Sequence, residues 1–319
     1  MDAPAEREGG GYLAALSAYV LWGFLPLYWP HLRPASVPEI IAHRVVWTSV
    51  FTLAAVAALG RGRRFLNILR SPRSTRLLVV AAIAMAANWM FFADAADRGA
   101  EVDISLGYFI NPLVTVLLGF AMFRESVRHT QWAACGIAGA GVVALAVQAG
   151  HLPVTSIGLA TTFALYGVVK KTAGIGALES VAVEMTLLAP FAGAFLAHVA
   201  AAGHGHLLSD GGAHLLLMLG AGPVTLAPLL LFSAATTRIP LVAVGLLQYV
   251  GPTIQFLLGV FLEHNAMSPA RFAGFATIWA ALALFATDGI RSARRRRAAR
   301  TLAAFPSPAA PTSAIALPE

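Results

Sequence analysis

Residues 106–125 read LGYFINPLVTVLLGFAMFRE, and residues 246–265 read LLQYVGPTIQFLLGVFLEHN. The two stretches lie 140 residues apart and share several identities at that offset. The shared positions are Leu106, Pro112, Leu117, Leu118 and Gly119, which recur as Leu246, Pro252, Leu257, Leu258 and Gly259. The same offset relates Glu39 to Glu179 and Arg98 to Arg238. A constant offset over this range indicates that one unit is written twice in the chain.

The composition indicates a membrane protein. Hydrophobic residues make up 58% of the 319 residues and charged residues only 12%, with a mean hydropathy of +0.73. A soluble domain carries roughly twice that share of charge. The single cysteine, Cys135, excludes an internal disulfide framework and a four-cysteine metal site. We find no complete ligand set for a metal and no motif for a cofactor, so we expect neither.

Apolar segments long enough to cross about 30 Å of hydrocarbon fill most of the chain. Open sheet edges are not viable in lipid, and the alternating pattern of a barrel is missing. We therefore predict an all-α polytopic membrane protein with ten transmembrane helices. The predicted helices lie at 11–31, 37–59, 77–97, 102–123, 131–148, 152–171, 178–202, 214–236, 240–262 and 269–288.

The duplication divides these spans into two five-helix units, 11–148 and 152–288, between an N-terminal tail (1–10) and a basic, then disordered, C-terminal tail (289–319). Because five is odd, the second unit must cross the membrane in the opposite sense to the first. The sequence therefore predicts two inverted five-helix repeats. Such repeats usually place a substrate site near the midplane, between the halves.

The distribution of lysine and arginine predicts the orientation in the membrane. With ten spans, eighteen of these residues fall on one side and only Arg33, Arg98 and Arg271 on the other. We expect both termini in the cytoplasm and the chain in the cell inner (plasma) membrane. The basic run RSARRRRAAR at 291–300 is typical of a topology anchor that contacts anionic lipid, and we expect no nucleic-acid partner.

Ionisable side chains inside membrane spans are costly and are commonly functional. The second span carries His43 and Arg44, and the seventh carries Glu184, which the repeat offset relates to Arg44. Arg44 either snorkels to the interface, pairs with Glu184 or binds the opposite end of a substrate. Glu184 is either a proton carrier or half of a static ion pair, and His43 is either a proton relay or a packing residue. We predict coupling or gating roles for all three.

Aromatic and amide side chains within the spans are the candidates for lining a cavity. Each has an alternative role, in an interfacial belt or packing for the aromatics and in helix–helix hydrogen bonds for the amides. Pro112 and Pro252 each free a backbone carbonyl four residues upstream, which predicts a break in both helices, where an inverted-repeat transporter often shapes its site. The predicted substrate-binding or cavity-lining residues are Trp22, Asn88, Trp89, Tyr108, Asn111, Tyr166, Gln248, Tyr249 and Gln255.

Five segments resemble the RarD-type branch of the EamA transporters, in the drug/metabolite transporter superfamily. They are LSAYVLWGFLPLYWPHL (16–32), PEIIAHRVVW (38–47), ANWMFFADAA (87–96), SLGYFINPLVTVLLG (105–119) and QYVGPTIQFLLGV (248–260), and the resemblance extends over about 12–290. It implies inverted five-helix repeats and secondary transport across a bacterial inner membrane. It also implies a cavity among the first, third, fourth, sixth, eighth and ninth helices. Members are commonly labelled chloramphenicol-sensitive proteins.

The chain departs from the related small multidrug branch, in which an acid in the first helix binds proton and cation. The span at 11–31 contains no acid, so that mechanism does not transfer. We predict a transporter without catalytic residues that moves a small organic metabolite or drug-like compound by alternating access, in the export direction, with protons as a candidate coupling ion. The alternatives are a non-transporting membrane sensor or assembly protein and a membrane-embedded enzyme. The sequence does not fix the oligomeric state.

Overall fold

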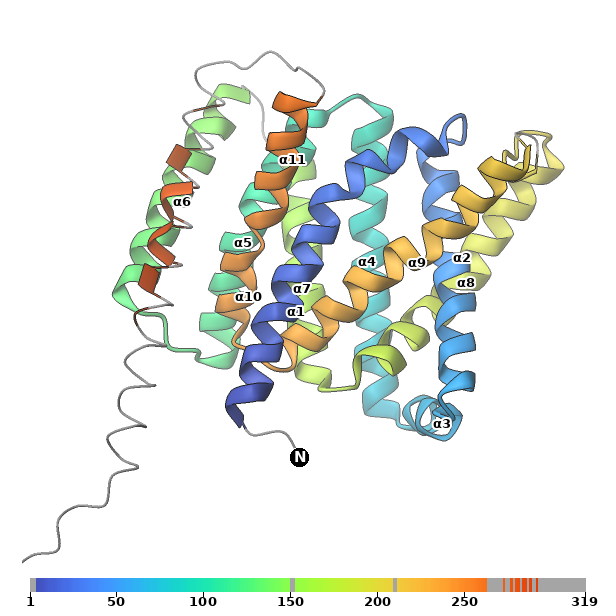
Figure 1. Ribbon diagram of the computed structural model, residues 1–319, viewed down its shortest axis with the longest axis horizontal. Helices are drawn as coiled ribbons and strands as arrows, with labels where there is room; N and C mark the ends of the chain where they lie inside the picture. The colour runs from blue at the N-terminus through green and yellow to red at the C-terminus, as the bar shows by residue number, and fades with distance from the viewer. Residues whose placement is uncertain are drawn as a thin grey trace, which may run out of the picture.

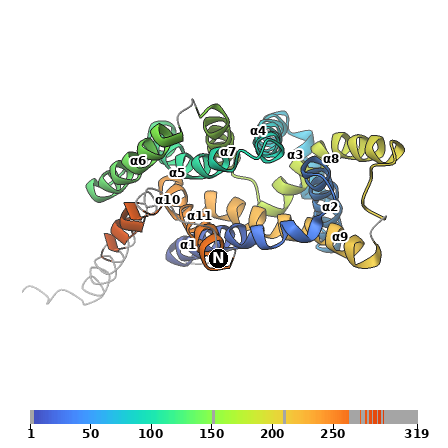
Figure 2. The same ribbon diagram turned by 90° about the horizontal axis from the view of Figure 1, so that it is seen from above.

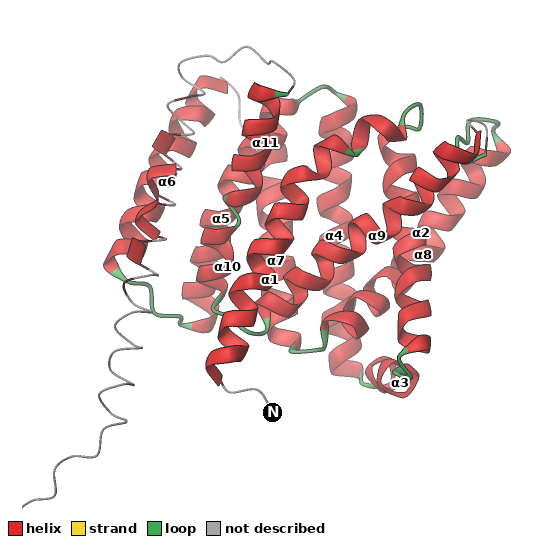
Figure 3. Cartoon of the chain, viewed as in Figure 1, coloured by secondary structure: helices red, strands yellow, loops and turns green. Residues whose placement is uncertain are grey.

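The computed structural model describes residues 4–149, 153–208 and 211–262, together with 272, 276–277, 279–281, 283–285, 287–288 and 291. Within these residues the chain consists of helices and their connections, without a strand (Figure 3). The helices, with η for 3₁₀-helix, are α1 (Pro4–Phe24), η1 (Leu25–Leu27), η2 (Trp29–Leu32), α2 (Val37–Ala58), α3 (Gly62–Arg70), α4 (Pro72–Asp97), α5 (Glu101–Phe123), α6 (His129–Ala149), α7 (Val154–Ala173), α8 (Ala177–Ala201), α9 (Gly211–Thr236), α10 (Leu241–Leu247) and α11 (Val250–Phe261).

A helix lies at each of the first nine predicted spans, and among the described residues seven helical segments are long and apolar enough to cross a membrane. The protein is therefore polytopic. The tenth predicted span, 269–288, and the tail at 289–319 fall largely outside the described residues, so the count of ten stays a prediction. Helix α3 was not predicted, because its basic sequence, GRRFLNILR, reads as a loop.

Proline and serine set several helix boundaries. The Ser36 and Ser71 hydroxyls cap α2 and α4, and each helix has a proline in its first two positions. Pro252 has no N–H to donate to the carbonyl of Gln248, which instead accepts a shorter-range bond of 3.1 Å from Gly251 N. The ninth predicted span therefore divides into α10 and α11 next to Gln248. The break predicted at Pro112 is wrong, because this proline lies inside α5, which stays continuous from Glu101 to Phe123.

The helices form a bundle with two distinct ends. The N-terminus, α3 and the α5–α6, α7–α8 and α9–α10 connections lie at one end, called here the α3 end (Figure 1). The α1–α2, α4–α5 and α8–α9 connections lie at the opposite end. Seen end-on, α4, α5 and α7 belong to one layer and α1, α9 and α11 to the other (Figure 2). Each layer therefore contains helices from both parts of the chain, since α7 lies with α4 and α5, and α1 lies with α9 and α11.

Contacts between the halves occur in pairs related by the repeat. Helix α7 packs on α4 and α5, and its counterpart α1 packs on α9 and α11, while α2–α8 and α5–α10 join equivalent helices. The hydroxyl of Tyr249 donates to the carbonyl of Phe109, 140 positions earlier, over 3.2 Å. Glu39 on α2 accepts a bond from His206 N, after α8, whereas Glu179 on α8 pairs with Arg61, after α2. The packing thus has the pairing expected of two similar halves.

Candidate functional site

A cavity of about 1040 Å³ lies between the two layers. Its walls come from the end of α1 with η1 and η2, the start of α2, α4, α5, α7, α9, and the α10–α11 region. The exposed lining residues are Pro30, Arg33, Glu101, Val102 and Ser105, and they lie toward the end opposite α3. The cavity therefore opens at that end and extends toward the middle of the bundle.

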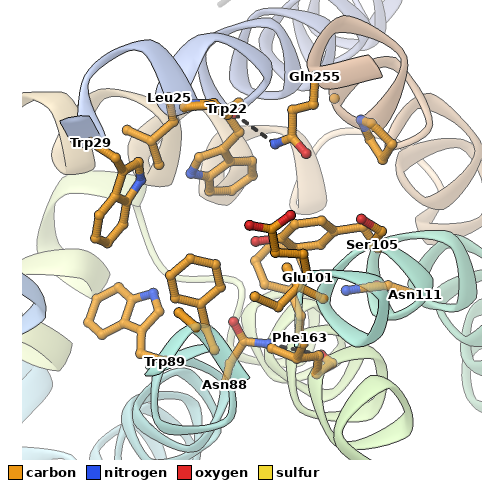
Figure 4. A pocket seen from close by; sticks show the side chains of 18 of the residues that line it. Trp22, Leu25, Trp29, Asn88, Trp89, Glu101, Ser105, Asn111, Phe163 and Gln255 are labelled. Atoms are coloured by element: carbon orange, nitrogen blue, oxygen red, sulfur yellow. Dashed lines mark hydrogen bonds between the residues drawn. The ribbon is translucent and has the colours of Figure 1, made fainter. Parts of the chain in front are cut away.

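Aromatic rings form much of its wall (Figure 4). Trp22 on α1 meets Phe163 on α7 edge-on, with ring centres 5.5 Å apart. Nearer the opening, Trp29 on η2 and Phe92 on α4 are also 5.5 Å apart. Because each pair joins the two layers, an apolar ligand between them would contact both layers of the bundle.

Amide side chains supply the polar part of the wall. Asn88 Nδ2 donates to the Leu159 carbonyl over 2.8 Å, which leaves its oxygen directed toward the cavity (Figure 4). Gln255 Nε2 donates to the Trp22 carbonyl over 3.3 Å. The oxygen of Gln248 is buried without a partner in the described part of the chain. A buried polar atom of this kind is costly, so a hydrogen-bonding ligand would be favoured here.

Arg44 is the buried cation of the cavity. It is 7% exposed, and its Nε donates to the hydroxyl of Thr225 on α9 over 2.8 Å. The guanidinium carbon lies 5.4 Å from the ring centre of Trp29 and 5.3 Å from that of Trp89. Both distances are within the range of cation–π attraction. Helices from three parts of the chain therefore hold one positive charge at the cavity wall.

The structure brings eight of the twelve predicted site residues together around this cavity. They are Trp22, Arg44, Asn88, Trp89, Tyr108, Asn111, Gln248 and Gln255. The other four, His43, Tyr166, Glu184 and Tyr249, do not line it. Tyr249 lies instead in the α5–α10 contact, where its hydroxyl bonds to Phe109.

Tyr166 and Glu184 belong to a sealed cluster between α7 and α8. Glu184 pairs with Lys170 over 2.6 Å and accepts a bond of 2.9 Å from the Tyr166 hydroxyl. Lys170 also donates to the hydroxyl of Ser180. The carboxyl group of Glu184 is fully buried. Glu184 and Arg44 therefore do not pair, because each has partners of its own on different helices.

His43 is also buried, on α2, and interacts electrostatically with Glu39 and His214. Its Nδ1 has no hydrogen-bond partner within the described ranges. No group of three or more His, Cys, Asp and Glu side chains in the described residues is placed to hold a metal ion. His206, in the HGH segment at 204–206, instead contacts Glu39 through both its backbone and its ring.

The α3 end of the bundle is closed by direct contact between α5, α7 and α10. The carboxylate of Glu125 accepts bonds of 2.8 Å from the first two backbone N–H groups of α10, at Leu241 and Val242. Lys171 on α7 lies 3.2 Å from the same carboxylate. A Cβ added to Gly119 would lie 3.0 Å from Val242 N, so glycine permits this close approach. The cavity is accordingly blocked on this side.

Sequence reasoning did not identify Trp29, Glu101 and Phe163 as lining residues. Trp29 lies in an aromatic segment typical of a membrane interface, and Glu101 in a crowded acidic segment where the span boundary was least defined. Phe163 lies one turn before Tyr166, and only the packing of α7 shows which of the two faces the cavity.

Residues 9–147 match the EamA-like transporter family. The chain is 41% identical over 304 residues to Protein RarD of Streptomyces exfoliatus, covering 95% of this chain and 96% of the relative. It is 37% identical over 291 residues to an uncharacterized transporter of Vibrio cholerae, covering 91% of this chain and 96% of that relative.

One crystal structure of a protein matches with a TM-score of 0.68, at 21% identity, over 86% of this chain and 96% of the other. That likeness concerns the fold alone. The sequence relationships extend over nearly the whole length of both chains, and the Vibrio cholerae relative is named as a transporter. The chain therefore belongs to the RarD-type branch of the EamA-like transporter family.

Proposed function

We propose that the protein is a secondary transporter that moves a small, partly apolar organic compound across the inner membrane by alternating access. Two inverted five-helix repeats enclose the cavity, which is the substrate site and is open to the outside in this structure. Both termini, and the α3 end, lie in the cytoplasm. The family resemblance favours export. The aromatic wall with a few amides suits a metabolite better than a bare ion.

One observation carries this proposal. On the closed side, Gly119 approaches Val242, and Gly245 approaches Pro112 and Thr115. Moving these positions by the repeat offset gives a second set of residues: Val102, Ser105, Pro252, Gln255 and Gly259. All of that second set line the open cavity. If the halves exchanged conformations, α5 would meet α11 at these residues, so the outer opening would close while the α3 end opened.

The proposal is tested by the accessibility of one residue from both sides of the membrane. Tyr108 lines the cavity and is partly exposed, so Tyr108→Cys in a Cys135→Ser background is a suitable reporter. We expect a membrane-impermeant maleimide to label it in intact cells and also in inside-out vesicles. A sensor or assembly protein with a fixed cavity would be labelled from one side only, and that result would contradict the proposal.

Two exposed positions serve as controls. Leu208, after α8, is 78% exposed at the outer end, and Leu69, on α3, is 38% exposed at the opposite end. Leu208→Cys should be labelled only in cells and Leu69→Cys only in inside-out vesicles. The reverse pattern would refute the proposed orientation without bearing on alternating access.

A further inference from the structure

Arg44 has no carboxylate partner among the described residues. Its contacts are the Thr225 hydroxyl and the rings of Trp29 and Trp89. The terminal nitrogens of the guanidinium donate to no protein group in the described part of the chain. Burying an ion is expensive unless the ion is paired and hydrogen-bonded. Two indole faces offset only part of that cost, because a cation–π contact is weaker than pairing with an opposite charge.

The position of Arg44 indicates which ligand group would pair with its guanidinium. The guanidinium lines an open cavity rather than a sealed core, so a ligand can reach it. Its planar set of donors matches a carboxylate, which accepts two parallel bonds, better than any neutral group. The missing partner therefore has the geometry of an organic acid.

The other charged residues that line the cavity also favour an anionic ligand. Its ionisable lining residues, apart from the tyrosines, are Arg33, Arg44 and Glu101. Arg33 and Glu101 are exposed at the opening, whereas Arg44 is buried. The lining thus has an excess of positive charge, and the inner charge is positive. An anion is attracted inward, while an amine would meet Arg44 as a like charge.

We infer that the cavity binds an amphipathic organic anion, whose carboxylate pairs with Arg44 and whose apolar body lies against Trp22, Trp29 and Trp89. This inference rests on the proposed function, because it names the substrate class of the same site. Arg44 is then a specificity-determining residue, and Thr225 positions it by holding Nε.

The test compares three ligands of nearly the same shape: 3-(indol-3-yl)propionate, its primary amide and tryptamine. Each is titrated against the full chain purified in detergent, with binding followed by isothermal calorimetry and by the shift in Tm. Inorganic phosphate at the same concentrations controls for charge alone. The variants are Arg44→Gln, Arg44→Lys and, as a matched control at the opening, Arg33→Gln.

We expect the wild type to bind the carboxylate roughly 10- to 100-fold more tightly than the amide, as for a charge-assisted pair. Arg44→Gln should abolish that preference by weakening carboxylate binding far more than amide binding, Arg44→Lys should retain part of the preference, and Arg33→Gln should retain most of it. A variant that merely disturbed the fold would weaken both ligands together. The comparison of carboxylate and amide binding by the wild-type protein tests the inference even if a variant folds poorly.

Several results would overturn the inference. These are equal or tighter binding of the amide or the amine, a preference that survives Arg44→Gln, phosphate binding as tight as carboxylate binding, or no binding of the carboxylate at millimolar concentration. None of them bears on labelling of Tyr108→Cys from both sides. Conversely, one-sided labelling with a clear carboxylate preference would refute transport and leave an anion receptor.

Discussion

Arg44 on α2 and Glu184 on α8 occupy equivalent positions in the two halves, yet their surroundings differ completely. Glu184 is fully buried against Lys170, Tyr166 and Ser180. Arg44 lines the cavity, between two tryptophan rings and without a counter-ion in the described structure. Glu184 therefore belongs to a complete buried ion pair, whereas the charge of Arg44 is at the wall of an open cavity.

The difference originates in the neighbouring helix. Lys170, the counter-ion of Glu184, is replaced at the equivalent position of the first half by Pro30. Around Pro30 the chain forms the short helices η1 and η2 instead of continuing α1, and Trp29 faces Arg44. Two positions related by the 140-residue offset thus both carry a charged residue, one in a sealed ion pair and the other at the cavity wall.

The largest effect should come from breaking the buried pair. Glu184→Ala leaves Lys170 as an uncompensated charge in a sealed cluster, so we expect a loss of about 3–5 kcal/mol in the free energy of unfolding. The measurement is Tm in detergent. The double variant Lys170→Met/Glu184→Leu should recover most of this loss, because no charge is then stranded.

The same pair also tests Glu184 as a proton carrier. If Glu184 is structural, the double variant should still show labelling of Tyr108→Cys from both sides, and a transported ligand should still move in liposomes. Loss of movement in a well-folded double variant would instead assign Glu184 a role in coupling.

A smaller effect is expected at the closed end. Glu125→Ala removes the cap of α10 and the contact with Lys171. Together these should stabilise the conformation closed at the α3 end by about 1–2 kcal/mol. Since both belong to the conformation closed at the α3 end, we expect labelling of Tyr108→Cys from the cytoplasmic side to rise about 5- to 30-fold. Asp97→Ala, an exposed acid at the opposite end, is the control. Equal rates in the two variants would show that Glu125 does not hold the closed end.

The smallest effect on stability should be that of Arg44→Gln. Removing a lone cation strands no opposite charge, and the lost cation–π contacts are offset by relief of the cost of burial. We expect a change within about 1 kcal/mol, again measured by Tm. A loss of stability as large as that for Glu184→Ala would mean that Arg44 stabilises the fold as much as Glu184 does. That result would contradict the proposed difference between the two residues.

Much of this architecture could be predicted from the sequence. The apolar segments indicated the first nine helices, and Pro252 indicated the break beside Gln248, whereas Pro112, for which the same break was predicted, lies inside the continuous helix α5. Most of the amides and tryptophans that line the cavity could be selected because they lie deep in the spans, near the prolines.

The partners of the charged residues could not be predicted. Lys170 was visible one turn from Tyr166, but only the placement of α7 relative to α8 in the bundle brings both side chains to Glu184. Glu101 and Trp29 lie at helix ends, where small boundary errors change whether a side chain faces lipid, water or the cavity. The partners of the charged residues and the direction of side chains at helix ends depend on how each helix is rotated and packed in the bundle. The sequence pattern does not determine that rotation.

The most direct test of exchange between the two halves is a cross-link at the outer opening. Val102 and Gly259 both line the cavity, and they are the repeat counterparts of the Val242 and Gly119 contact at the closed end. We expect Val102→Cys and Gly259→Cys, in a Cys135→Ser background, to form a disulfide in native membranes and to block labelling of Tyr108→Cys from outside while preserving it from inside. Failure of the pair to cross-link under oxidising conditions that join cysteines elsewhere in the protein would contradict alternating access.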